Sequence, residues 1–306
     1  MRKLRTFLIL LFILNYTKSH SQGCSDAGFC TMGALGPMVS EDTLASTFIN
    51  LNAGFASGEQ KTKHTILSLE LGLALIKDNI IQIKLPYHMV NGDLGSNYGV
   101  GDMTISTTHT LSRSERSSFS ASLGLKLPTG TTDYIENGIS LAMPYQTGLG
   151  TTDLILGTSY QYQKWRISAG YQMVLNNKNE NRYLKSNGTE DFEKAYFDSN
   201  LLNRGDDALL RIERAFDVKK LKIMIGLLSI YRLQEDEISN LNSQTIKLDG
   251  SDGITLNATF GLQYPISSKM ELGIVYGSPL VVRDTRADGL TRSFVGTGSL
   301  KYIFGK

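Results

Sequence analysis

The sequence is poor in the residues on which most metal, redox and nucleophilic chemistry depends. Its 306 residues include two cysteines, four histidines and one tryptophan. The cysteines form no CxxC pair, and no GxSxG motif of a hydrolase nucleophile occurs. After the N-terminal leader, no stretch approaches the roughly 20 apolar residues of a membrane-spanning helix. These absences argue against a zinc or thiol-redox protein, an α/β-hydrolase and a helical membrane protein.

Residues 1–21 have the order of a secretory signal peptide. Arg2, Lys3 and Arg5 precede the apolar run 7–14, and the small residues Ser19 and Ser21 stand before the expected cleavage site at Gln22. The exported chain is therefore expected to begin at residue 22.

Cys24 and Cys30 would then lie in an oxidising compartment, where a disulfide between them is expected. A lipid anchor on Cys24 is a weaker alternative, because no leucine stands three residues before it. A redox or metal role is also weaker, because no histidine of the exported chain is close in sequence.

The exported chain is nearly neutral. Of 31 basic residues, Arg2, Lys3, Arg5 and Lys18 leave with the leader, so 27 face 29 acidic residues. No basic cluster resembles a nucleic-acid footprint, and export argues against such a partner.

Apolar and polar side chains alternate with a period of two, which indicates strands. In the first clear example, Leu67, Leu69 and Leu71 alternate with Ser68 and Glu70. The pattern predicts twelve strands, beginning near Thr47, Thr65, Ile80, Asp102, Ser118, Asp153, Arg166, Ala208, Leu221, Thr255, Glu271 and Arg292.

Connections between these segments are alternately short and mostly long, as in outer-membrane β-barrels. Aromatic residues gather at the two strand ends, for example Trp165 and Tyr264 near short turns and Phe55 and Tyr231 near long loops. The sequence thus predicts an all-β, up-and-down transmembrane barrel in the outer membrane of a Gram-negative bacterium. A soluble lipocalin-like or sandwich fold remains the alternative, because alternation alone does not say what covers the apolar face.

Three stretches carry a family resemblance: Leu85-Pro86-Tyr87, then Gly99-Val100-Gly101-Asp102, then 125–130 (LKLPTG), followed by 148–153 (GLGTTD). Their order resembles the outer-membrane transporter family named for the meta-pathway of phenol degradation, which is similar in architecture to FadL-type channels. The resemblance covers residues 80–171 best. It implies a barrel that admits small hydrophobic compounds, and no ligand residue is carried over from it.

The register sends a set of mostly charged side chains toward the lumen. These candidates are Glu70, Lys84, His88, Lys126, Asp153, Arg166, Arg211, Glu213, Lys222, Arg232, Glu271 and Lys301. A salt-bridge lattice is favoured over an anion-selective lining, because unpaired charge in a narrow lumen is costly.

Catalytic, metal and cofactor sites are not assigned. His88 is expected to point inward beside Lys84, His109 outward, and His64 to lie in a loop. The loop 249–253 (DGSDG) lacks the closing glutamate of a calcium loop.

Residues 22–46 precede the first strand and contain Phe29, Met32, Leu35 and Met38, which would be exposed in the periplasm. FadL-type channels, which the chain resembles, hold an N-terminal hatch in the lumen. The prediction is that 22–46 enters the lumen from the periplasmic side as a plug stiffened by the disulfide, with 47–306 forming the barrel.

The predicted function is passage of a small, hydrophobic molecule, without enzymatic activity. The partners are outer-membrane lipid, the solute and, during insertion, the barrel-assembly machinery. Two alternatives stay open: a structural or assembly-partner barrel, and an outer-membrane lipid hydrolase.

Overall fold

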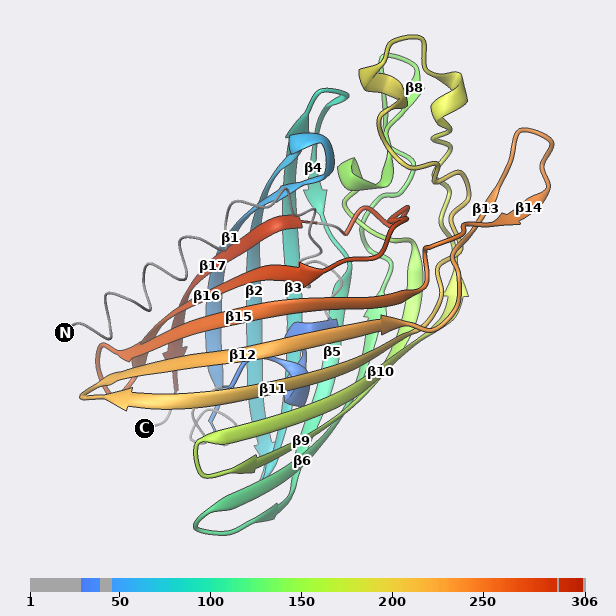
Figure 1. Ribbon diagram of the computed structural model, residues 1–306. Coiled ribbons are helices and arrows are strands. Elements are labelled where there is room, and N and C mark those ends of the chain that lie inside the picture. The colour runs from blue at the N-terminus through green and yellow to red at the C-terminus, as the bar shows by residue number, and fades with distance from the viewer. Residues whose placement is uncertain (1–28, 39–45, 291, 305–306) are drawn as a thin grey trace, which may run out of the picture.

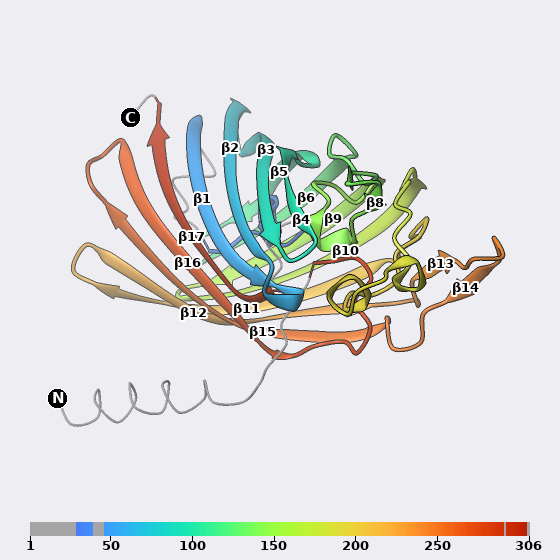
Figure 2. The same cartoon turned by 90° about the horizontal axis from the view of Figure 1, so that it is seen from above.

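The computed structural model describes residues 29–38, 46–290 and 292–304, and these residues form a closed antiparallel barrel of twelve strands (Figures 1 and 2). Its strands are β1 (Phe48–Gly58), β2 (Lys63–Ile76), β3 (Asn79–Gly92), β5 (Met103–Arg113), β6 (Ser117–Leu127), β9 (Thr151–Tyr162), β10 (Trp165–Asn177), β11 (Asp207–Val218), β12 (Leu221–Arg232), β15 (Gly253–Pro265), β16 (Met270–Val281) and β17 (Arg292–Ile303). The first and last strands pair, with Phe48 opposite Ile303, and this pairing closes the ring.

Each of the twelve strands begins within two residues of its predicted start. The prediction succeeded because one buried and one lipid-facing side fix the register of a strand through its period of two. The fold class predicted from the sequence is therefore confirmed.

The expectation that His64 lies in a loop is wrong. The β1–β2 connection is a tight turn around the 3₁₀ helix η5 (Glu59–Lys61), and the ladder continues to the pair Ser57–Lys63. His64 is therefore the second residue of β2, where its side chain is buried and its Nε2 lies 3.0 Å from the Thr62 hydroxyl. The apolar alternation that was read from the sequence starts only after it.

The wall is interrupted between β4 (Gly95–Val100) and β5. β5 pairs with β3 from Asn79 to Lys84, whereas β4 pairs with β3 from Tyr87 onward. Between them the backbone at Gly101 crosses Pro86, whose carbonyl accepts a hydrogen bond of 2.9 Å from the Gly101 amide. Because proline offers no N–H, this is where a ladder can be interrupted at least cost.

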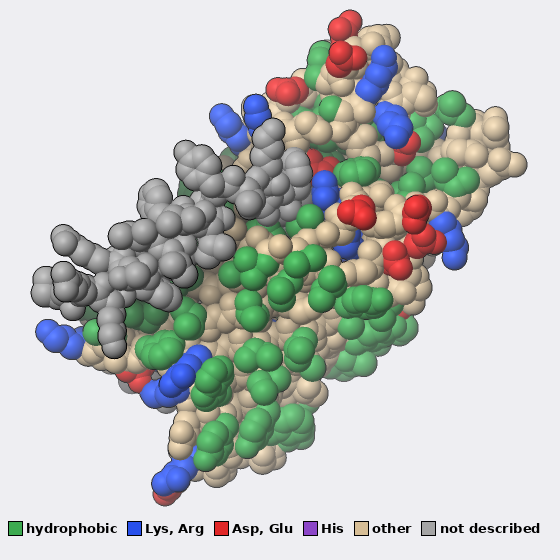
Figure 3. Space-filling view, in the orientation of Figure 1, with side chains coloured by type: hydrophobic (Ala, Val, Ile, Leu, Met, Phe, Trp, Pro, Cys, Tyr) green, Lys and Arg blue, Asp and Glu red, His purple; other side chains and the backbone are tan. Residues whose placement is uncertain are grey.

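The outer face of the barrel is a hydrophobic band. Leu67, Leu123 and Leu156 are each 44–49% exposed on the middle of their strands, and Figure 3 shows apolar side chains along the wall with charged ones at its ends. Aromatic residues are exposed at both rims, including Trp165, Tyr162, Phe216 and Tyr264 at the short turns and Phe55, Tyr87, Tyr231 and Tyr276 toward the long loops. No helix within the described ranges is long and apolar enough to cross a membrane.

The long connections pack on one another at the end of the barrel opposite the short turns (Figure 1). They contain the short strands β7 (Ile135–Glu136), β8 (Ile139–Ser140), β13 (Glu237–Ser239) and β14 (Thr245–Lys247), and the 3₁₀ helices η6 (Met143–Tyr145), η7 (Lys185–Asn187) and η8 (Phe192–Lys194). Tyr145 and Tyr183 each stack edge-to-face on Tyr196, at centroid distances of 5.6 and 6.4 Å. Burial raises the pKa of Tyr183 to about 12. The Tyr145 and Tyr196 hydroxyls lie 2.8 Å apart, so the loops are held by hydrogen bonds as well as by ring contacts.

Candidate functional site

Residues 29–38 lie inside the barrel and carry two 3₁₀ helices, η2 (Phe29–Thr31) and η3 (Gly33–Leu35). The backbone of this lumen segment bonds to the wall, because the Ala34 amide donates to Ser122 Oγ at 2.8 Å and the Met38 carbonyl accepts from Gln263 Nε2 at 3.1 Å. Gly33 has φ +48°, and a Cβ there would lie 2.5 Å from the Thr108 hydroxyl oxygen. Only glycine fits this approach without strain.

A glycine pair in the wall receives the side chain of Leu35. Gly157 on β9 and Gly170 on β10 are directly opposite each other in the ladder. A Cβ at Gly157 would lie 2.7 Å from Leu35 Cγ, and one at Gly170 would lie 2.6 Å from Leu35 Cδ1. Leu35 is 0% exposed and packs in one cluster with Met32 and Ile155. We call this glycine pair the Leu35 socket.

Two arginines and one glutamate of the wall hold the same segment through hydrogen bonds to its backbone. Arg166 lies 3.0 Å from Glu213, and Arg211 lies 3.5 Å from the same carboxylate. Arg211 also donates to the Cys30 carbonyl at 2.7 Å, Arg166 donates to the Gly36 carbonyl, and Glu213 accepts from the Met38 amide at 3.0 Å. Three of the predicted lumen residues therefore bind the segment rather than line an open passage.

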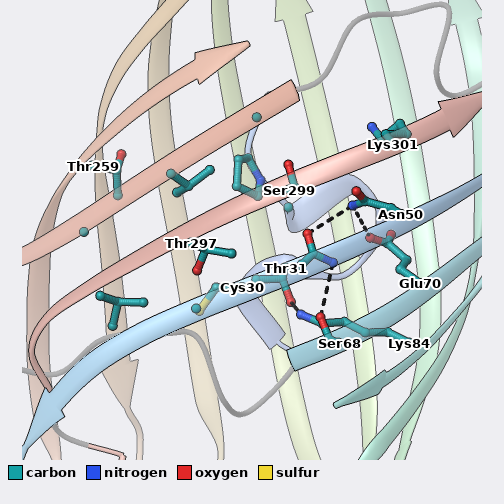
Figure 4. Close-up of a pocket in the computed structure, with 18 of the residues that line it drawn as sticks. Cys30, Thr31, Asn50, Ser68, Glu70, Lys84, Thr259, Thr297, Ser299 and Lys301 are labelled. Carbon is teal, nitrogen blue, oxygen red and sulfur yellow. Dashed lines mark hydrogen bonds between the residues drawn. The ribbon is translucent and has the colours of Figure 1, made fainter. Parts of the chain in front are cut away.

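The segment leaves one side of the lumen unfilled. A cavity of about 230 Å³ lies between residues 30–37 and the wall formed by β15, β16, β17, β1, β2 and β3. Lys84 donates to Thr31 Oγ1 at 2.9 Å across its floor, and Asn50 bonds to Glu70 at 3.1 Å on its wall (Figure 4). Lys301 and Glu271 lie 3.7 Å apart on adjacent strands of the same wall.

A buried network of charges lies where the long loops meet the barrel. Lys126 is 2.8 Å from Asp153, and Arg232 is 2.7 Å from Asp207 and 3.0 Å from Asp288. The other members, all buried, are Asp102, Arg204, Asp236 and Arg283. Burial by itself would raise the pKa of Asp288, but Arg283 and Arg232 outweigh it and hold that pKa well below its usual range.

The stretches that carried the family resemblance meet at Asp102. Its carboxylate accepts from the Gly130 amide at 3.1 Å and from the Leu149 amide at 2.8 Å, and lies 3.8 Å from Lys126. A Cβ at Gly130 would lie 2.7 Å from Gly148 Cα, so the two ends of the β6–β9 connection approach each other closely where both residues are glycine. The order and spacing of these motifs thus build a junction between the connections, and the sequence alone did not show this contact.

One contact outside the membrane wall ties two loops together. Glu59 lies 2.8 Å from Arg286, and burial raises the pKa of Glu59 to about 7 although Arg286 lowers it.

The remaining predicted residues fall elsewhere on the inner face. His88 is 5% exposed and packs under the backbone of Gly101, while His109 is exposed on β5. Lys222 is half-buried one position from the β11–β12 turn, on the face of β12 that also carries Met224 and Leu228. Within the described ranges no group of three His, Cys, Asp or Glu side chains is placed to hold a metal.

Several predictions concern residues outside the part of the chain that the structure describes. They are the signal peptide at 1–21, the position of Cys24, and the two ends of the predicted plug, at 22–28 and 39–45. Cys30 is described and buried, and its pairing with Cys24 stays a prediction.

The closed twelve-stranded wall, the hydrophobic outer band and the aromatic rims define an outer-membrane β-barrel of the kind found in Gram-negative bacteria. The model of the family described as "Putative MetA-pathway of phenol degradation" matches residues 39–193, just over half of the chain. The chain belongs to this family, as its motifs indicated.

A solved structure shows the same fold. An outer membrane channel from Pseudomonas putida F1 superposes with a TM-score of 0.60 at 16% sequence identity, over 85% of this chain and 96% of that chain. The NanC porin gives a TM-score of 0.47 at 8% identity, over 84% and 100% of the two chains. The transport unit of the autotransporter AIDA-I from Escherichia coli gives 0.47 at 12% identity, over 93% and 98%. No curated protein sequence matches the chain.

Proposed function

We propose that the protein is a channel through which a small, largely hydrophobic molecule crosses the outer membrane, and that residues 22–46 form a plug that restricts it. The observation that carries this proposal is the cavity of about 230 Å³ between the lumen segment and one side of the wall. A barrel with a purely structural role would need no such space beside a segment fastened by side chains of β6, β10 and β11.

The interior supports a selective passage rather than a wide ionic pore. The predicted lumen charges Lys126, Asp153, Arg166 and Glu213 are all paired and buried. Such pairs fill space and leave little free charge to attract ions. Outer-membrane lipid covers the hydrophobic band, and insertion by the barrel-assembly machinery follows from the proposed location.

Planar-bilayer conductance tests the proposal. The full-length protein is expected to give a closed or low-conductance state, and deletion of Asp26 to Val39 a stable, larger pore. A variant that inserts normally and conducts no more than the wild type would show that the segment is not a plug. Liposome swelling with uncharged solutes separates a channel from a structural barrel, because a structural barrel would admit none.

A further inference from the structure

The cavity beside the lumen segment has one polar wall that is arranged by a single carboxylate. Glu70 on β2 accepts from Asn50 Nδ2 at 3.1 Å and from Gln82 Nε2 at 2.9 Å (Figure 4). A carboxylate only accepts hydrogen bonds, so both amides must turn their nitrogens toward Glu70. Their oxygens are thereby left on the other side.

These oxygens are the first indication of a ligand. Asn50 is 7% exposed, and its Oδ1 accepts no hydrogen bond from any residue that the structure describes. The same holds for Gln82 Oε1 within the described chain. Buried polar atoms are nearly always hydrogen-bonded in native proteins, so two such oxygens lining one cavity predict a donor that enters it.

A second unpaired group of opposite character lies on β15. Asn257 is 3% exposed and lines the same cavity, and its Nδ2 donates to no acceptor among the residues described. In the ladder it is opposite Leu228, which is buried beside the lumen segment. The cavity therefore presents acceptors at β1 and β3, and at β15 both the Asn257 donor and a further acceptor, Gln263 Oε1.

Each charged side chain that lines the cavity has a partner. Lys301 pairs with Glu271, and Lys84 is bonded to Thr31 and faces Glu70 across the β2–β3 ladder. Arg211 shares Glu213 with Arg166 and also donates to the Cys30 carbonyl. The rest of the lining includes the apolar side chains of Phe48, Val275 and Val295. Such a surface favours an apolar body and offers an ion no uncompensated partner.

We propose that this cavity binds an uncharged amphipathic molecule with an apolar body, whose hydroxyl or N–H group donates to Asn50 Oδ1 and whose carbonyl or hydroxyl oxygen accepts from Asn257 Nδ2. This inference rests on the proposed function, since it names the class of solute that the channel selects.

The test uses the full-length protein in nanodiscs and three probes of similar size: cyclohexanol, cyclohexanone and cyclohexanecarboxylate. Dissociation constants are measured by ligand-observed NMR, with empty nanodiscs to correct for partition into lipid. Asn50→Leu is expected to weaken cyclohexanol about tenfold, the usual effect of one hydrogen bond, and to leave cyclohexanone unchanged. Asn257→Leu is expected to weaken cyclohexanone by a similar factor. The carboxylate is expected to bind at least tenfold more weakly than cyclohexanol.

Thr297→Val is the matched control. Thr297 on β17 lines the same cavity, the change keeps the size of its side chain, and neither Asn50 nor Asn257 bonds to it. It should change neither affinity more than about threefold. If Asn50→Leu does not insert as a folded barrel, Gln82→Met removes the neighbouring acceptor and tests the same point.

Equal weakening by Asn50→Leu and Thr297→Val would overturn the inference, as would a carboxylate that binds as tightly as the alcohol. Neither result would contradict the proposal that the protein is a channel. That proposal fails only if the wild-type protein admits no uncharged solute into liposomes.

Discussion

Replacing Leu35 by alanine should release the lumen segment. Leu35 is fully buried in the socket of Gly157 and Gly170. Buried Leu→Ala changes cost ~2–5 kcal/mol, the larger values where the site does not collapse. Leu35 belongs to the lumen segment and not to a strand of the wall. We therefore expect the lost free energy to weaken docking of the segment and to leave the stability of the barrel unchanged.

A loss of about 3 kcal/mol changes the ratio of docked to released segment about 100-fold, at 1.4 kcal/mol for each factor of ten. Single-channel recording in planar bilayers measures this ratio directly as the fraction of time in a higher-conductance state. Leu35→Ala should raise that fraction by up to two orders of magnitude. Leu123→Ala, on the lipid face, is the control and should leave it unchanged.

The socket provides a stricter test through a compensating pair. A Cβ added at Gly157 would point into the space that the Leu35 side chain occupies. The double variant Leu35→Ala with Gly157→Ala should therefore close more often than Leu35→Ala alone, a coupling that only direct contact produces. Two results would refute this account. One is a fraction of time in the higher-conductance state for Leu35→Ala that lies within threefold of the wild type. The other is a double variant that has the same fraction as Leu35→Ala alone.

Three further outcomes are expected. Leu123→Arg, on the lipid-facing middle of β6, should lower the free energy of unfolding in lipid by ~2–4 kcal/mol, whereas Thr297→Arg, on the cavity wall, should cost much less; equal costs would contradict the assigned faces. Because the folded pKa of Glu59 is raised to about 7, the folded state binds more protons than the unfolded state between about pH 4.5 and 7, and the free energy of unfolding should fall by at most about 3 kcal/mol as pH rises through this window. Glu59→Gln should remove this pH dependence in denaturant titrations. An unchanged pH dependence would assign it to other groups. Asp102→Ala should leave Lys126 with one partner fewer and expose residues 131–147 to limited proteolysis at least tenfold faster, whereas Asp133→Ala at an exposed position should not.

The strands and their faces could be predicted from the sequence because both depend on neighbours two residues apart. The placement of Leu67 and Glu70 on opposite faces needed no knowledge of other strands. The cavity depends on contacts that no local pattern encodes. Asn50 and Asn52 look equivalent in the alternation, and only their contacts distinguish them. Asn52 Oδ1 accepts from Asn50 Nδ2, whereas Asn50 Oδ1 accepts from no residue that the structure describes.

The charge network at the loops was harder still to foresee. Arg204, Asp236, Arg283 and Asp288 lie in connections that have no periodicity, and they meet through ion pairs that join different loops. Lys126, Asp153 and Arg232 were predicted because they are on strands, but their partners Asp102, Arg204 and Asp288 were not. A local signal existed only for Asp102, which follows Gly101 in one of the family motifs and was not singled out as a side chain.

The Leu35 socket also has a consequence for the order of assembly. The segment precedes β1, but its partners are on the opposite side of the ring, at sequence separations of 88 residues for Ala34 and Ser122, 175 for Met38 and Glu213, and 181 for Cys30 and Arg211. The socket itself exists only once β9 and β10 have paired. The part of the segment described here is thus the first to be synthesised and among the last to find its place, because contacts so distant in sequence form late. Its docking can occur only in a barrel whose far wall is already built, so a chain that stalls during insertion would stay unplugged.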